Sequence, residues 1–474
     1  MQDRFGLPIT TDSTVAADHL QKGVDLVLSR NYGPEEQFHL ALEADEGFAL
    51  AHCSQAHISM LRGKGSEARE FAEQAKTLSS GISERERSQI EAVHLWVNGK
   101  GPQALAVIKE HLKDYPRNAM LLGLSQRLYM LGCSGAGVPN FPGELFNLVQ
   151  SVEKHCNDDW SFLSQFSFAH HETGSLDEAL SLSERSLEMY PSNGVASHSV
   201  AHVYFEKGDA SSGGDFLGKW LDGYDKRGPS TVHLSWHQAL FQIAMGRYQN
   251  ALDLYESGVR PTVVEKGPTA LNDSASLMWR WQMYTHAAAP APWEEVCAIA
   301  ASAADNPGPA FRDAHAALAL ASGDPEAFGR LQARLGEAAK DGNPLAAEVT
   351  LPLVQGIGAF AEGNYSDAAT KLGPLAPQLA RIGGSHAQRE VFEDTLLEAY
   401  LRSDQVEKAE TMLRERLGRR PSYRDTFWMG RAQVTAGETE QATATLQNAI
   451  SGWDGGDKNS QELANLTELA DSLN

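Results

Sequence analysis

The sequence predicts an all-α protein, a solenoid built from repeated helical hairpins. Two observations carry this prediction: a short residue pattern recurs along the chain, and its recurrences lie at a nearly constant spacing. The pattern is a Gly, an Ala five residues later, an apolar residue four further on and a small residue three after that. Its instances begin at Gly63, Gly99, Gly174, Gly246, Gly363, Asp404 and Gly437, with a weaker one at Gly208.

Each position of the pattern has a physical role in a helical hairpin. The Gly ends the first helix, because it adopts the left-handed backbone conformation at low cost. The Ala lies where the two helices cross, since a larger side chain would hold them apart. A proline such as Pro116, Pro191 or Pro421 stops the second helix before the next hairpin begins.

The spacing of the markers identifies the kind of repeat. Consecutive markers are 36 residues apart (63 to 99), 34 (174 to 208), 38 (208 to 246), 41 (363 to 404) and 33 (404 to 437). Tetratricopeptide (TPR) units have a period of about 34 residues. The intervals 99–174 and 246–363 have room for two and three units. We therefore predict a single TPR-like α-solenoid over residues 1–474, curled around a central groove or pocket.

Three stretches interrupt or end the predicted array. Residues 133–143 are rich in Gly and Pro and predict a loop between repeats. Residues 287–293 are rich in Ala and Pro and predict a second break. Residues 455–474 form a tail with a polar helix at about 460–473, which we expect to cap the array because solenoids need polar ends for solubility.

Composition limits the classes of partner and location. The net charge of −22 repels phosphate backbones and anionic membrane surfaces, so neither nucleic acid nor membrane is expected as a partner. The four cysteines form no CxxC pair, which argues against disulfides and a Cys-rich zinc site. The first 13 residues lack a signal-peptide pattern, and a cytoplasmic location is the expectation. A homodimer is the base-rate expectation for oligomeric state.

Two His-x-x-x-His pairs are the first candidates for function among the sixteen histidines. They are His198 with His202 and His233 with His237, and on a helix this spacing puts both rings on one face. Both pairs fall on first helices, which line the concave surface of a TPR array. They could supply acid–base groups or metal ligands, or serve only in helix packing.

A zincin motif is absent from both histidine pairs. That motif needs Glu directly after the first His, where this chain has Ser199 and Leu234. No metal or other cofactor is therefore predicted from the sequence.

Further candidates lie on later predicted helices. Asp313 could orient an imidazole, and His315 lies two residues beyond it. Asp273 and Arg280 are seven residues apart and share a helical face, which a salt-bridged surface explains equally well. Trp236, with Trp279, Trp281 and Tyr284, could form a stacking wall for a ligand or be ordinary core.

The segment Gly383-Gly384-Ser385 predicts the start of another helix. Ser385 is the expected N-cap, and the free N–H groups of a first helical turn attract anions. Arg389, one turn further, could add a bidentate clamp on the same anion. The alternative is an ordinary helix start with Arg389 paired to an acid.

Several of these segments, taken in order, resemble the tetratricopeptide repeat protein 38 family. The more specific ones are His233-x-x-Trp236-His237 and Gly383-Gly384-Ser385-x-Ala387-Gln388-Arg389. The resemblance covers most of the chain, from about residue 24 to 413. It implies a TPR fold with a polar pocket rather than a generic peptide scaffold. One departure is Gln126-Arg127, where the family tends to carry a His.

Two functions follow from these patterns. In the first, the concave surface holds a small polar or anionic ligand, bound by Arg280 and Arg389, and the histidines catalyse hydrolysis or a lyase-type proton transfer. In the alternative, the array is a non-catalytic scaffold that binds a peptide or partner protein in its groove.

Overall fold

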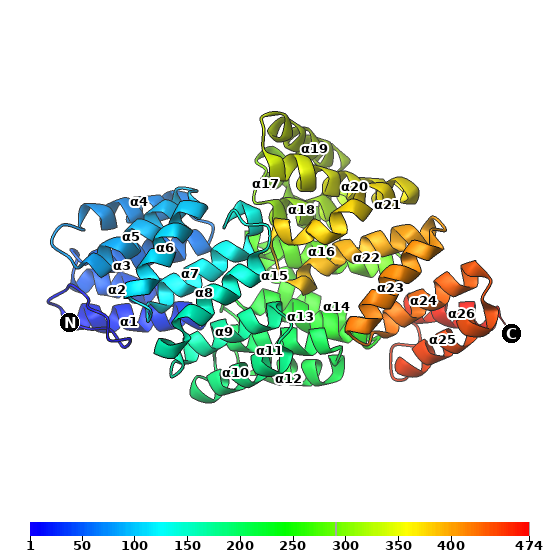
Figure 1. The fold of residues 1–474 in the computed structure, drawn as a ribbon, viewed down its shortest axis with the longest axis horizontal. Coiled ribbons are helices and arrows are strands. Elements are labelled where there is room, and N and C mark those ends of the chain that lie inside the picture. The colour runs from blue at the N-terminus through cyan, green and yellow to red at the C-terminus, as the bar shows by residue number, and fades with distance from the viewer. Residues whose placement is uncertain (290–291, 474) are drawn as a thin grey trace. The chain divides into compact units, whose positions relative to one another are not determined.

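The computed structural model describes residues 1–289 and 292–473, and within them the chain is helical with short connections (Figure 1). An isolated bridge between Gln2 and Pro8 is the single β-type pairing found in the described residues. The all-α class predicted from the sequence is confirmed. No helix within these ranges combines the length and apolarity needed to cross a bilayer.

The chain divides into two compact units. Unit 1 comprises Met1–Val200 and Gly223–Ser230, and unit 2 comprises Ala201–Asp222 and Thr231–Asn474. The boundary falls inside helix α11 (Gly194–Lys207), so the first turns of this helix belong to unit 1 and its last turns to unit 2. The prediction of one continuous array over residues 1–474 stays a prediction.

Unit 1 is a series of helical hairpins. Its helices are α1 (Thr14–Leu28), α2 (Pro34–Ala44), α3 (Ala49–Leu61), α4 (Gly65–Thr77), α5 (Glu84–Val97), α6 (Gly101–Asp114), α7 (Ala119–Met130), the 3₁₀ turn η1 (Gly132–Ser134), α8 (Phe141–Cys156), α9 (Trp160–Glu172) and α10 (Leu176–Met189). Each odd-numbered helix from α1 to α9 packs on the helix that follows it.

Unit 2 continues with hairpins of the same kind. Its elements are α12 (Ala210–Asp222), α13 (Thr231–Ala244), α14 (Tyr248–Leu254), η2 (Tyr255–Val259), α15 (Arg260–Val264), η3 (Pro268–Ala270), α16 (Leu271–Thr285), α17 (Trp293–Asp305), α18 (Ala310–Gly323), α19 (Pro325–Lys340), η4 (Ala346–Thr350), α20 (Leu351–Ala361), α21 (Tyr365–Leu372), η5 (Gly373–Ile382), α22 (His386–Arg402), α23 (Val406–Arg419), α24 (Tyr423–Ala436), α25 (Thr439–Gly452) and α26 (Gln461–Asp471).

The predicted hairpin turns are present at every marker of the repeat pattern. All eight markers have a positive φ, from 54° at Asp404 to 86° at Gly174. This is the left-handed conformation that ends a helix and reverses the chain. Asp404 adopts it without being a glycine, which Asp tolerates better than most residues. The TPR-like hairpin repeat is therefore confirmed.

The alanines of the pattern are buried where the helices of a hairpin cross. The six at positions 68, 104, 179, 368, 409 and 442 have no exposed surface, and Ala251 is 1% exposed. In the hairpin of α24 and α25 the approach is close enough that a Cβ added to Gly430 would lie 2.5 Å from Leu446. The crossing therefore leaves room for small residues only.

Two intervals that the pattern did not resolve contain the number of hairpins predicted from their length. The hairpin of α7 and α8 turns at Gly132, which has a φ of 55°. Between Gly246 and Gly363, the first of three further hairpins turns at His286, with a φ of 57°, and the second turns at Gly323–Asp324. The pattern missed the turn at His286 because a non-glycine residue holds the left-handed conformation there.

The predicted interruptions differ slightly from the observed ones. In the 133–143 stretch, α8 already begins at Phe141, because a proline in the first turn favours helix formation. In the 287–293 stretch, residues 290 and 291 lie outside the described residues. The tail helix is α26, capped by Ser460. Its role as a cap of the array stays a prediction.

We expect Ala442→Leu to destabilise the hairpin of α24 and α25, because overpacking a close helix crossing costs about 1–3 kcal/mol. Hydrogen exchange measured by mass spectrometry should become about 5- to 150-fold faster in peptides from this hairpin. Ala444→Leu is the matched control, because Ala444 is exposed on the same helix. Equal exchange in the two variants would contradict the prediction.

Candidate functional site

Three histidines of unit 2 come together at the centre of the candidate site. His202 lies on α11, and His233 and His237 lie one turn apart on α13. The ring centroids of His202 and His237 are 4.5 Å apart, and those of His233 and His237 are 4.7 Å apart. Nitrogen atoms of the three rings lie within 4.8 Å of one another. We call these three residues the histidine cluster.

The histidine cluster is shielded from solvent. His202 is 0% exposed, His237 is 1% exposed, and the side chain of His233 is 18% exposed. The fourth predicted histidine, His198, lies one turn before His202 on the same face of α11. It belongs to unit 1, where its ring stacks on Phe168 of α9.

Asp273 on α16 fixes the orientation of one imidazole. The Nδ1 atom of His233 lies 3.1 Å from both carboxylate oxygens of Asp273, which is itself 4% exposed. A carboxylate accepts, so Nδ1 carries the proton that it donates. This bond holds the ring in place and leaves Nε2 as the basic nitrogen of His233 when the ring is neutral.

Trp236 and Arg280 form one wall beside the histidine cluster. The ring of Trp236 stacks on His233 at a centroid distance of 5.3 Å, and the Arg280 guanidinium lies 5.8 Å from the Trp236 ring. Asp273 and Arg280 therefore share the face of α16 that meets α13, as their spacing predicted. Of the other aromatic residues proposed for this wall, Trp279 donates to Thr395 and Tyr284 donates to Asp394, so both belong to the contact with α22.

Arg280 also joins α16 to the start of α22. It donates to Ser276 and to the carbonyl of Ala387, the latter at 3.0 Å, and its Nε lies 3.6 Å from a carboxylate oxygen of Asp394. Arg280 is 2% exposed, and the carboxylate of Asp394 offsets the positive charge of its guanidinium. Its positive charge is therefore only partly available to a ligand.

Ser385 is the N-cap of α22, as predicted. Its hydroxyl accepts from the N–H of Gln388, and the Gln388 side chain accepts from the N–H of Ser385, which completes a capping box. Arg389 donates to the carbonyl of Gly384 in the preceding turn. Binding of an anion by this turn stays a prediction.

His315 on α18 is a neutral imidazole close to the site. Burial lowers its pKa to about 4; Asp273 acts to raise this pKa, and Arg280 acts to lower it. Its Nδ1 lies 2.8 Å from the carbonyl of Phe311, to which it donates, so Nε2 is the basic nitrogen. Helix α18, which carries His315, packs on α16, which carries Asp273 and Arg280.

Asp313 lies on the same helix as His315 but has other partners. It accepts from the N–H of Gly308 at 2.6 Å and from Arg312 at 3.4 Å, and burial raises its pKa to about 6. These partners are Gly308, in the turn before α18, and Arg312, its neighbour on the helix. The predicted role of Asp313 in orienting an imidazole stays a prediction.

A second cluster, which sequence reasoning did not single out, follows Ser385 on α22. His386 lies 2.8 Å from Glu206 through Nδ1 and 3.8 Å from Glu393 through Nε2. Burial lowers its pKa, but Glu206 and Glu393 raise it more, to about 9. Arg420 binds the neighbouring Glu390 at 2.6 Å. The His-x-x-x-Glu-x-x-Glu spacing on one helical face was the available signal in the sequence.

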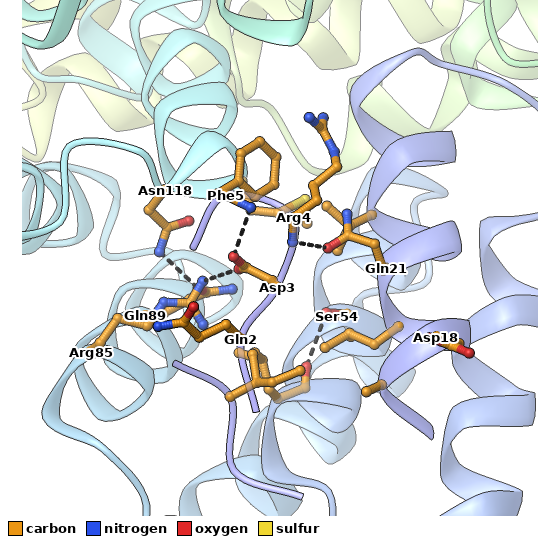
Figure 2. Close-up of a pocket in the computed structure, with 16 residues that line it drawn as sticks. Gln2, Asp3, Arg4, Phe5, Asp18, Gln21, Ser54, Arg85, Gln89 and Asn118 are labelled. Atoms are coloured by element: carbon orange, nitrogen blue, oxygen red, sulfur yellow. Dashed lines mark hydrogen bonds and ion pairs between the residues drawn. The ribbon is translucent and has the colours of Figure 1, made fainter. Parts of the chain in front are cut away.

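A cavity of unit 1 is lined in part by the N-terminal residues Gln2 to Phe5 (Figure 2). It holds about 280 Å³. Asp3 accepts from the N–H groups of Phe5 and Leu7 and lies 3.4 Å from Arg85, which is 4% exposed. Figure 2 shows Gln89 and Asn118 beside this pair. None of the predicted site residues lines this cavity.

Comparisons with family models and with solved structures identify similar folds but no family for this chain. A scan of family models matched none to this chain. Similar solved structures include yeast Tom70 (10% identity, covering 97% of this chain and 95% of that one, TM-score 0.29) and the Cut9–Hcn1 hetero-tetramer of APC/C (12%, 89% and 79%, 0.44). A tetratricopeptide repeat protein from Parabacteroides merdae is a further one (13%, 66% and 98%, 0.28). The resemblance to the tetratricopeptide repeat protein 38 family stays a prediction.

We expect His386 to make the stability of unit 2 depend on pH. Its folded pKa, about 9, lies above the ordinary value of 6.5, so its contribution is complete below about pH 6.5 and is lost as the pH rises through 9. The stability difference between wild type and His386→Gln should shrink by on the order of 2–3 kcal/mol between pH 6 and pH 10. Chemical denaturation at several pH values measures it.

The matched control for this experiment is His39→Gln, because the side chain of His39 is 68% exposed. This variant should follow the wild type at every pH. A His386→Gln difference that stays constant from pH 6 to pH 10 would show that Glu206 and Glu393 do not hold a proton on His386.

Proposed function

We propose that this chain binds a small polar or singly charged anionic molecule at the histidine cluster. The observation that carries the proposal is the convergence of three imidazoles and Asp273 in one buried place. Burying so many polar groups is costly, and a core that served packing alone would be more stable with apolar residues. Their grouping on helices from three different hairpins favours a binding role.

The arrangement also suits proton transfer. An imidazole held by a carboxylate through Nδ1 is the usual form of a general base, and His233 with Asp273 has this form. His237, in ring contact with both His202 and His233, could pass or accept the proton. Hydrolysis and lyase-type elimination are the reaction classes that such a group serves.

The charges around the site limit which class of ligand it can bind. Arg280 is paired with Asp394, so the ligand is not required to neutralise a full positive charge there. Arg389 already donates to a backbone carbonyl. A ligand with no charge, or with one carboxylate that bonds to a protonated imidazole, fits this balance better than a phosphate does.

The alternative function is a scaffold for a peptide or a partner protein. A TPR-like array is an architecture suited to protein interaction, since stacked first helices form an extended surface. The net charge of −22 favours a basic partner. Nucleic acid is disfavoured by the same charge, and this exclusion, a cytoplasmic location and a homodimer stay predictions.

A thermal-shift screen of a metabolite library tests the small-ligand proposal. A ligand at 100 times its dissociation constant stabilises the folded state by about 2.7 kcal/mol, which raises the melting temperature measurably. Hits on the wild type should disappear in His237→Asn and persist in His39→Asn. Hits that are equal in His237→Asn, or no hits at all, would contradict the proposal.

The scaffold alternative gives the opposite pattern. Binding of an array of basic peptides to the wild type, unchanged in His237→Asn, together with an empty metabolite screen, would favour the scaffold.

A further inference from the structure

We infer that His202, His233 and His237 bind a divalent transition-metal ion, such as Zn²⁺, in unit 2. This inference deepens the proposed function and rests on the same residues. Imidazole nitrogen suits Zn²⁺, Ni²⁺ and Cu²⁺, and a set of three imidazoles with a fourth position left to water or substrate is the usual arrangement of a catalytic zinc site.

The geometry of the histidine cluster is close to that of a metal site. One ring nitrogen of each histidine lies within 4.8 Å of the others. Nitrogen ligands at about 2.0–2.1 Å from a tetrahedral Zn²⁺ are about 3.4 Å apart. A contraction of at most about 1.4 Å between these nitrogen atoms, within the reach of small rotations of the side chains, would complete the site.

Asp273 supplies the support that metal-binding histidines usually have. Such a histidine generally donates its other ring N–H to a carboxylate, which fixes the tautomer and makes the ligand nitrogen more basic. His233 donates Nδ1–H to both oxygens of Asp273 at 3.1 Å, which directs Nε2 away from Asp273. The carboxylate also offsets part of the charge that the ion would bring.

The second histidine-containing cluster does not share these features. His386, Glu390 and Glu393 also lie within 4.8 Å of one another. Two carboxylates hold a proton on His386, and Arg420 and Arg416 lie against Glu390. A protonated imidazole cannot be a ligand, and carboxylates paired with arginine offer an ion little attraction. The inference is therefore confined to the first cluster.

Metal content and affinity test the inference directly. Full-length protein is treated with a chelator, dialysed against micromolar Zn²⁺ and then metal-free buffer, and assayed by mass spectrometry for bound metal. We expect one Zn²⁺ per chain, with its affinity measured by competition with a chromophoric chelator. His202→Asn, His233→Asn and His237→Asn should each lower the affinity at least about 100-fold, and His39→Asn should not.

Unfolding is an alternative cause of any loss of Zn²⁺ affinity in the histidine variants. Asp273→Asn tests for it, because this variant keeps all three imidazoles. It should lower the Zn²⁺ affinity about 10- to 100-fold while the circular dichroism spectrum stays that of the wild type. Co²⁺ in place of Zn²⁺ should give the visible absorption of a tetrahedral site. No stoichiometric metal in the wild type, or an affinity that the histidine substitutions leave unchanged, would overturn the inference.

Running the metabolite screen with and without chelator separates this inference from the proposed function. Ligand hits that survive in chelator, with no bound metal, overturn the metal site and leave the ligand site standing. One tightly bound Zn²⁺ with no ligand hits supports the metal site and counts against the ligand proposal.

Discussion

The close crossing of the two helices in each hairpin is the constraint on which the rest of the structure depends. Fully buried alanines such as Ala104 and Ala442 let the helices approach until a single added methyl group would clash, as at Gly430. Helices packed this tightly cannot rotate freely about their axes. The face that each first helix turns toward the next hairpin is therefore fixed, and with it the direction of every polar side chain on that face.

This fixed orientation explains how polar side chains from several hairpins meet in unit 2. Buried polar groups must find partners or destabilise the fold, and here the partners lie on neighbouring first helices. Asp273 of α16 bonds to His233 of α13, and Arg280 of α16 pairs with Asp394 of α22. Arg416 then links Asp394 to Asp425 of α24 at 2.8 and 2.9 Å. Helix α16, which carries both Asp273 and Arg280, thus connects the histidine cluster to an ionic network on α22, α23 and α24.

The fold could be predicted from the sequence because the signals that set it are local. A left-handed turn and a small residue at a helix crossing act within one hairpin of about 34 residues, and a single sequence reveals them. The pattern missed the turn at His286, because a non-glycine residue adopts the left-handed backbone conformation there. Parts of the candidate site were predictable for the same reason: the i, i+4 spacing of the histidines and the capping role of Ser385 are local. The balance of Arg280 by Asp394 depends on a contact between residues more than 100 positions apart, which no local pattern contains.

The two histidine-containing clusters of unit 2 show why residue type alone does not determine chemistry. Both put imidazole and carboxylate within a few ångströms. His386 faces two carboxylates, so it holds its proton well above neutral pH, and it serves as a cation in an ionic network with Arg416 and Arg420. In the histidine cluster three imidazoles lie together, and one of them, His233, bonds to Asp273. A neutral imidazole offers a lone pair, which is what a proton acceptor or a metal ligand requires. The proposed roles of the first cluster, as proton acceptor and metal ligand, therefore depend on imidazole lone pairs, whereas His386 in the second cluster keeps its proton between two carboxylates.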